Sequence, residues 1–367
     1  MGLEFLEATM KARDVAPLLS RQYGVEANDV VPLSQRDPDA ITYCSNSFVA
    51  TTSDDDYIVK ELTLDGTSKD LVYQETKADI ADFLEARGVP IAHHHRTSEG
   101  KSFGDFKGHA VEVLDYIPNT RNYQFGNIGD VSEAAQALAG FNYALASLPT
   151  ERPEIFQKLQ ARQDLFGTTG EDLDAILERK DFVDELTSVA NKFRGIREDV
   201  LYFFEDVRRV REDWSGGLVG GTAVIHRDFH GNNVIFDKED GELKAILDFD
   251  TICVGPSGYD LGYSGIFFSS DIPKPFEAPR IELFNLFGEN YIQEMKSLEP
   301  SFEIESPVRA VEQIRRDMVN RTASVIMSRY FRGENAGDGP IVNHLGIHKR
   351  MRDLKKLIHK SLKKEYS

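Results

Sequence analysis

Asp228, Asn233 and Asp248 stand in one short stretch of the chain, at a spacing that could serve catalysis. The stretch has the form H-x-D-x-x-x-x-N, followed by an apolar run that ends in Asp, which is the order of parts in a kinase catalytic block. Asp228 could accept the proton of an attacking hydroxyl group. Asn233 and Asp248 offer the hard oxygen atoms that Mg²⁺ prefers. The spacing therefore predicts a magnesium-dependent phosphoryl transfer.

Short apolar runs around this stretch predict the strands that position it. Val224–Ile225 leads into the loop, Val234–Phe236 leaves it, and Ala245–Leu247 brings the chain back. Between the last two runs, Lys238–Gly241 has the composition of a hairpin turn. In an ordinary hairpin, Asp and Asn would only cap turns. The order of all the polar residues together favours a catalytic site at the edge of an apolar platform.

The stretch from Val224 to Tyr263 resembles the aminoglycoside phosphotransferase and choline kinase superfamily, the small-molecule branch of the kinase fold. This resemblance implies that Asp228 is the catalytic base and that Asn233 and Asp248 bind Mg²⁺. The residues that carry the resemblance are His226-Arg227-Asp228, Asn233, Leu247-Asp248-Phe249-Asp250 and Tyr259-Asp260.

Other residues of the same stretch are expected around the reaction centre. The resemblance implies that His226 braces the catalytic loop and that Asp260 holds the loop from behind. His230, two residues after the base, could face the transferred phosphate or the acceptor, and a loop-bracing histidine would look the same. Asp250 could contact the acceptor or cap a turn, and Tyr263 could bind an acceptor group.

The first third of the chain is expected to grip the nucleotide. Residues 47–51 and 57–60 alternate like paired strands, and Lys60 lies where kinases carry a phosphate-binding lysine. A helix is predicted over residues 68–86, and its Glu75 is expected to form an ion pair with Lys60. The stripe that this helix would bury consists of Val72, Thr76, Ile80 and Phe83.

Contacts to the rest of the nucleotide are expected from a polar turn and from a hinge. No glycine-rich loop precedes Lys60, in contrast to protein kinases. A strand over residues 110–114 is predicted to lead into the hinge, where backbone groups of Leu114 and Tyr116 would bind adenine. The small polar residues expected to meet the phosphates are Ser45, Asn46 and Ser47.

These elements predict an α+β fold class, namely a two-lobed protein-kinase-like fold. Residues 1–113 would form a strand-rich N-terminal lobe with one helix, and residues 114–120 the hinge. Residues 121–367 would form a larger, mainly helical C-terminal lobe that carries the catalytic residues and binds the acceptor. Helical spacing at 130–147 and through 152–214 supports this division.

The acceptor is predicted to be a small molecule, with ATP and Mg²⁺ as cofactors. Asp248 and Asp260 are close in sequence and no A-P-E segment follows, so the platform that protein kinases use for peptides is missing. The helices of 152–214 would wall the cleft. Residues 247–251 are similar to N-acetylhexosamine kinases and 46–90 to homoserine kinases. Sugars or amino sugars, amino alcohols and hydroxy-amino acids all remain open. The alternatives are a kinase acting on a protein-bound small group and a non-catalytic ATP-binding regulator.

Composition limits the other partners. The net charge of −18 argues against binding nucleic acid. No apolar run reaches the roughly 20 residues that span a bilayer, so no membrane partner is expected, and no secretion signal is recognised at the N-terminus. A cytoplasmic location is the resulting expectation. Cys44 and Cys253 have no metal-site spacing. The basic C-terminal segment predicts an amphipathic helix of open role, and the oligomeric state is open too.

Overall fold

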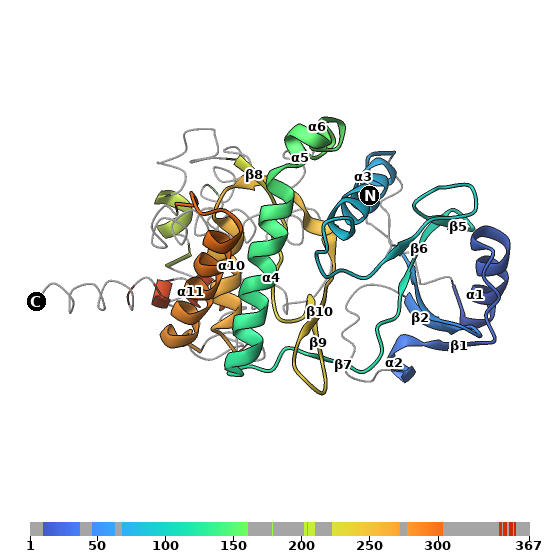
Figure 1. Cartoon of the computed structure of the whole chain (residues 1–367), viewed down its shortest axis with the longest axis horizontal. Helices are drawn as coiled ribbons and strands as arrows, with labels where there is room; N and C mark the ends of the chain where they lie inside the picture. The colour runs from blue at the N-terminus through green and yellow to red at the C-terminus, as the bar shows by residue number, and fades with distance from the viewer. Residues whose placement is uncertain are drawn as a thin grey trace, which may run out of the picture. The chain divides into compact units, whose positions relative to one another are not determined.

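The chain forms two compact units (Figure 1). Residues 4–159 and 228–252 make up the first, which we call the sheet unit, and residues 1–3, 160–227 and 253–367 make up the second unit. The predicted lobes, with a boundary at residues 114–120, divide the chain differently and stay a prediction. The computed structural model describes residues 10–36, 46–62, 68–160, 178, 202–203, 205–209, 222–271, 277–303, 345–346, 348–350, 352–354 and 356.

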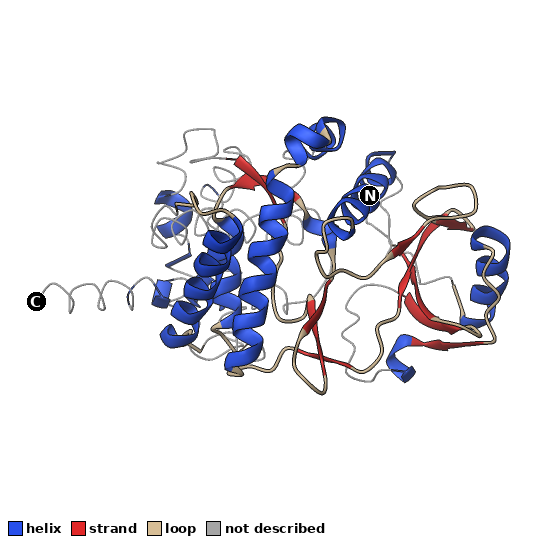
Figure 2. Ribbon diagram, viewed as in Figure 1, coloured by secondary structure: helices blue, strands red, loops and turns tan. Residues whose placement is uncertain are grey.

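A six-stranded antiparallel sheet is the framework of the sheet unit (Figure 2). Its strands follow the order β1-β2-β3-β6-β4, and β5 pairs with β6. The strands predicted at 47–51, 57–60 and 110–114 are confirmed as β2, β3 and β6. The strand bounds are β1 (Asp29–Pro32), β2 (Asn46–Thr51), β3 (Asp56–Glu61), β4 (His94–His95), β5 (Gly104–Phe106) and β6 (His109–Asp115).

The two faces of this sheet differ in character. One face is apolar, and there Phe48, Val59 and Val111 pack in a core with residues of α1 (Ala12–Leu18). Because side chains alternate along a strand, the neighbours of these residues point to the opposite face. That face carries Lys60 and Glu112, and it is the face on which a polar site can form. The remaining short elements at this end are the π-helical turn η1 (Leu19–Tyr23) and α2 (Leu33–Arg36).

The predicted helix is present as α3 (Ser68–Glu85). Thr76, Ile80 and Phe83 are buried as predicted, but Val72 is 51% exposed. The prediction of Val72 is wrong, and its neighbour Tyr73 is the residue that is buried there. Gly88, with φ of 72°, follows the helix end in the left-handed conformation that favours glycine.

A second, three-stranded sheet in the order β10-β9-β7 carries the hairpin predicted to hold the catalytic residues. Gly241 lies in the turn between β9 and β10 with φ of 76°, as the hairpin prediction requires. α4 packs on β10, and its first residues are capped by the side chain of Asn127, which accepts hydrogen bonds from Gly129 and Asp130. The bounds are β7 (Thr120–Asn122), β9 (Val234–Asp237), β10 (Leu243–Ile246), α4 (Ile128–Ala146), α5 (Leu148–Glu151) and α6 (Pro153–Gln160).

In the second unit, β8 (Thr222–Ile225) pairs antiparallel with β11 (Cys253–Pro256). α10 (Tyr259–Phe268) is buried along its whole length and packs on α11 (Ile281–Leu298). Most of the helices predicted within 152–214, and most of the basic C-terminal helix, lie outside the described residues. Over the part of the chain that the structure describes, no helix has the length and apolar character needed to cross a membrane.

Candidate active site

Three neighbouring strands present polar side chains to one another. Ser47 on β2 is paired with Lys60 on β3, and Lys60 is paired with Glu112 on β6. Residues directly opposite in an antiparallel sheet share a face and lie close together. The Lys60 side chain is 24% exposed, and its ammonium group lies 3.7 Å from Oδ2 of Asp250. The polar face therefore presents an accessible cation of the kind that could meet a phosphate group.

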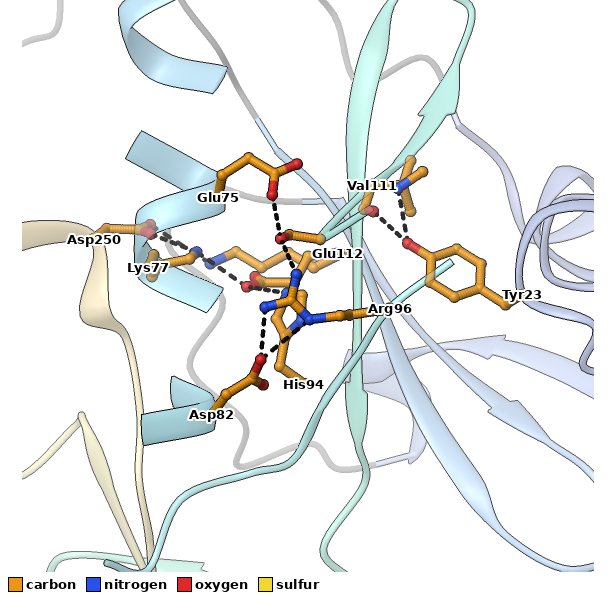
Figure 3. Close-up of polar contacts among 12 residues, drawn as sticks. Tyr23, Glu75, Lys77, Asp82, His94, Arg96, Val111, Glu112 and Asp250 are labelled. Atoms are coloured by element: carbon orange, nitrogen blue, oxygen red, sulfur yellow. Dashed lines mark hydrogen bonds and ion pairs between the residues drawn. The ribbon is translucent and has the colours of Figure 1, made fainter. Parts of the chain in front are cut away.

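The ion pair predicted between Lys60 and Glu75 is wrong for this structure. Oε2 of Glu75 accepts a hydrogen bond from the Ser102 hydroxyl at 2.7 Å, and that hydroxyl also accepts one from Arg96 (Figure 3). Helix geometry explains the difference, since residues two apart are rotated by about 200° around the axis. Because Lys77 faces the sheet, Glu75 has to face elsewhere.

Lys77 is the residue of α3 that faces the sheet, at the position where Glu75 was expected. Its Nζ lies 3.0 Å from Oε1 of Glu112 and 2.9 Å from Oδ1 of Asp250 (Figure 3). The side chains of Lys77 and Glu112 are each 6% exposed. Burial opposes both charges, yet the attraction of Glu112 and Asp250 raises the pKa of Lys77. Burial is likewise outweighed at Glu112, where Lys77 and His94 hold the pKa far below its usual range. The pair is therefore charged.

Sequence reasoning missed both Lys77 and Glu112, although each carries a signal. Glu112 is a charged residue in the middle of an otherwise apolar strand. Lys77 falls on the helical stripe marked by Tyr73, Ile80 and Leu84, all of which are buried. Charged residues are rarely buried without a partner. A lysine and a glutamate that each interrupt an apolar pattern could have been recognised as a pair.

Asp228 and Asn233 are joined within the predicted catalytic loop. Nδ2 of Asn233 donates a hydrogen bond of 2.8 Å to the backbone carbonyl of Asp228 and lies 3.5 Å from its Oδ2. Because the nitrogen end of the amide is used in this way, the carbonyl oxygen of the same side chain is the end that can bind a cation. The backbone N–H of Leu247 donates to the carbonyl of Asn233 at 2.8 Å, which ties the loop to the strand before Asp248.

His230 faces the carboxylate of Asp228. Its Nδ1 accepts a hydrogen bond from the backbone N–H of Asn232 at 3.2 Å. In the neutral ring the proton then resides on Nε2, which lies 3.5 Å from Oδ2 of Asp228. His230 can therefore orient the predicted base through an N–H group.

Asp248 lies in a turn that α3 holds in place. It adopts a left-handed backbone with φ of 61°, which is uncommon for residues other than glycine and typical of strained functional positions. The short helix η3 (Phe249–Thr251) follows. The hydroxyl of Tyr73 donates to the carbonyl oxygens of Phe249 at 2.7 Å and Ile252 at 3.2 Å. This contact fixes the turn on both sides of Asp250.

The acids of this turn have opposite electrostatic surroundings. Desolvation raises the pKa of Asp248, and the carboxylates of Asp250 and Asp228 raise it further. Desolvation would also raise the pKa of Asp250, but Lys77 and Lys60 outweigh it and lower that pKa to about 2. The charge of Asp250 is thus balanced by lysines, whereas an additional cation would stabilise the charged form of Asp248. Asp250, which was expected either to contact the acceptor or to cap a turn, is the counterion of both lysines, and its contact with the acceptor stays a prediction.

The donor set fits Mg²⁺. Asn233 and Asp248 offer hard oxygen ligands, and Mg²⁺ is usually bound by one or two such groups together with water and substrate phosphates. Among the described residues no group of three or more His, Cys, Asp and Glu side chains could hold a metal ion alone. A metal ion at Asn233 and Asp248 would therefore take its remaining ligands from water and from the nucleotide phosphates.

Asp260, the second residue of α10, supports the backbone just before the predicted catalytic base. Its two carboxylate oxygens accept hydrogen bonds of 2.8 Å from the N–H groups of His226 and Arg227. Asp260 is 1% exposed and His226 is fully buried. Arg227 has a left-handed backbone with φ of 69°. The arrangement holds the segment that leads directly to Asp228.

Replacing Asp260 by asparagine should lower both stability and turnover. An amide can accept only one of the two N–H groups, and its own NH₂ would face the other. Leaving a buried donor unpaired costs about 1–3 kcal/mol. Urea unfolding and steady-state kinetics would measure the two effects, with Glu282→Gln, an exposed carboxylate of the same unit, as control. Wild-type values for Asp260→Asn in both measurements would contradict this role.

The expected phosphate contacts divide into three cases. Nδ2 of Asn46 donates to the carbonyl of Met10 and to Oε2 of Glu61, so its predicted role is corrected to a structural one. Ser47 stands opposite Lys60 on the polar face, where its predicted contact with phosphate stays a hypothesis. Ser45 lies outside the described residues.

The predicted hinge departs from expectation at one backbone group. The N–H of Tyr116 donates to the carbonyl of Asp56 at 3.0 Å, so it cannot bind adenine in this conformation. Leu114 is paired with strands on both sides, opposite Ile58 and His94. A cavity of about 460 Å³ adjoins the hinge, lined by residues 52–56 and 115–118. Four of its residues are aspartates and none is a predicted catalytic residue, so this cavity is unsuited to phosphate groups.

Tyr263 does not have the surroundings of an acceptor contact. It is 3% exposed and lies in the apolar core of the second unit. Its ring stacks on Tyr259 and packs on Phe267, with centroids 5.6 and 4.4 Å apart. The predicted role in binding the acceptor is therefore corrected to one in packing.

Comparison with known proteins yields one family and a consistent set of structures. The phosphotransferase enzyme family, APH, matches residues 44–295. Spectinomycin phosphotransferase APH(9)-Ia, solved with ADP and spectinomycin, is 16% identical, with a TM-score of 0.61 over 94% of this chain and 95% of that one. Amicoumacin kinase hAmiN, solved with AMP-PNP, Ca²⁺ and Ami, is 12% identical, with a TM-score of 0.60 over 94% of each chain. Choline kinase LicA from Streptococcus pneumoniae is 14% identical, with a TM-score of 0.52 over 95% of this chain and 98% of that one.

The predicted two-lobed, kinase-like α+β fold class is confirmed.

Proposed function

The chain belongs to the phosphotransferase enzyme family, and from this premise we propose that it transfers the γ-phosphoryl group of ATP to a hydroxyl group of a small molecule. Asp228 is the base, and Asn233 with Asp248 binds Mg²⁺. The observation that carries this proposal is the joined catalytic loop, in which Asn233 uses its amide nitrogen to hold Asp228 and keeps its oxygen for a cation.

In the proposed reaction, the acceptor hydroxyl attacks the γ-phosphorus in line with the bond that breaks, and its proton passes to Asp228. His230 orients the Asp228 carboxylate through its Nε2–H group. Lys60 offsets charge on the nucleotide phosphates from the polar face of the sheet. When bound, Mg²⁺ offsets charge on the β- and γ-phosphates. Positioning and charge neutralisation would supply most of the rate acceleration.

The acceptor is proposed to be a sugar or amino sugar, an amino alcohol or a hydroxy-amino acid. The solved structures most useful for comparison include one that contains spectinomycin and one of a choline kinase, so related folds serve chemically different acceptors. No described residue distinguishes among these three classes. A direct screen is therefore the appropriate test.

The screen would incubate the purified protein with Mg·ATP and separate pools of the three acceptor classes, and would measure ADP release. We expect one pool to raise the rate above the acceptor-free level, and Asp228→Asn to lose that increase. Mass spectrometry of the active pool would identify the phosphorylated compound. Nucleotide binding without release of ADP in any pool would favour a non-catalytic regulator or a protein-bound acceptor instead.

A further inference from the structure

The lysine and acid that face each other in this site have exchanged elements relative to the kinase arrangement. In kinases a strand lysine is paired with a glutamate of the following helix. Here the helix α3 provides a lysine, Lys77, and the strand β6 provides the acid, Glu112, at 3.0 Å. The strand lysine, Lys60, is present in addition. Among the residues that the structure describes, the site therefore contains two lysines, of which Lys60 is accessible and Lys77 is buried.

The strand register places Glu112 where it could pair with Lys60 and so compete with nucleotide phosphates for the lysine. The two residues are directly opposite in the β3–β6 pairing, where side chains come within about 5 Å at Cβ and opposite charges attract. Yet the ammonium group of Lys60 is found 3.7 Å from Asp250, while Glu112 is bound by Lys77 and approached at 3.5 Å by Nε2 of His94. Lys77 thus satisfies the acid that would otherwise attract Lys60.

The burial of the two lysines agrees with this division of roles. Lys77 is 6% exposed and enclosed by Glu112 and Asp250, so it has little surface left for a ligand. Lys60 is 24% exposed and is next to Asp250, itself 43% exposed. A phosphate group could approach Lys60 from solvent without first breaking a buried ion pair. The accessible lysine is the one suited to the nucleotide, and the buried one is suited to holding the acid.

We propose that Lys77 is a positioning residue that neutralises Glu112 and thereby keeps Lys60 available for the nucleotide phosphates. This inference rests on the proposed function, because it assumes that Lys60 meets the phosphates of a bound nucleotide. It differs from a purely structural role in one respect. If the loss of Lys77 weakens nucleotide binding because Glu112 is left unpaired, then replacing Glu112 as well should restore nucleotide binding.

The test is a double-mutant cycle read out by Mg·ADP binding in isothermal titration calorimetry. Lys77→Met keeps the length of the side chain and removes its charge. We expect it to weaken Mg·ADP binding about tenfold or more, in the range that coupled residues show. Lys77→Met/Glu112→Gln should bind within about threefold of wild type, since replacing both partners removes the competing acid. Lys101→Met, an exposed lysine paired with Glu99, is the control with the same change in charge.

Each outcome decides between the roles. A Lys77→Met variant that binds like wild type overturns the inference, as does a double variant that binds no better than the single one. If Lys77→Met does not fold, the double variant decides alone, since a tenfold loss in its folded form contradicts the inference and near-wild-type binding supports it. Failure of the wild-type protein to bind Mg·ADP would instead overturn the proposed function, so the two failures are distinguishable.

Discussion

Asp228→Asn is expected to reduce turnover by at least about 100-fold, the lower range of what a general base contributes. The amide cannot accept the proton of the acceptor hydroxyl. Nucleotide binding should be retained, because Asn233 is held by the backbone carbonyl at position 228 and not by the carboxylate alone. Steady-state ADP release and calorimetric binding of Mg·ADP would measure the two properties separately.

The control for this variant is Asp240→Asn, which changes an exposed aspartate of the β9–β10 turn in the same way. It should leave turnover and binding at wild-type values. If Asp228→Asn kept turnover within about threefold of wild type, another residue would have to be the base.

Asp248→Asn is expected to raise the Mg²⁺ concentration needed for ADP binding by about tenfold or more. Losing a charged ligand costs about 1.5–3 kcal/mol. Asparagine is preferred to alanine here because it tolerates the left-handed backbone that Asp248 adopts. Calorimetric titrations of ADP at several Mg²⁺ concentrations would measure the change, again with Asp240→Asn as control. An unchanged Mg²⁺ dependence would remove Asp248 from the metal site.

The two variants should also differ from each other in kind. Asp228→Asn affects a step after binding, so its loss should appear in kcat. Asp248→Asn affects assembly of the nucleotide site, so its loss should depend on the Mg²⁺ concentration and be reduced when Mg²⁺ is raised. Equal behaviour of both variants across Mg²⁺ concentrations would argue against separate roles for base and metal ligand.

The parts of the fold that sequence predicted well are those with local signals. The hairpin around Gly241, the paired strands that carry Lys60, and the helix that begins at Ser68 all follow from periodicity and turn residues. The catalytic loop could be predicted because its residues are close in sequence and have a fixed spacing. Such signals do not depend on how distant segments pack.

The errors of the sequence-based predictions arise where packing between distant segments decides which residues are buried and which groups form hydrogen bonds. Val72 and Tyr73 are both apolar, so composition alone could not fix which residues of α3 are buried, and Glu75 was assigned the place against the sheet that Lys77, two residues later, occupies. Tyr263 could not be distinguished from a ligand contact without knowing that α10 is buried on all sides. Whether the N–H of Tyr116 is available to a ligand depends on the carbonyl of Asp56, 60 residues earlier in the chain, to which it donates.

The alignment of Ser47, Lys60 and Glu112 across three strands makes the site sensitive to length changes inside those strands. A single residue inserted within β3 before Lys60 would turn the lysine toward the apolar face, where Val59 now packs, and would bring an apolar side chain to the polar face. Insertions in the exposed Ser53–Asp55 turn would leave the register unchanged. The length of the turn can therefore vary in evolution or engineering, whereas the length of the strand cannot. An insertion inside the strand would disrupt the fold and the site together.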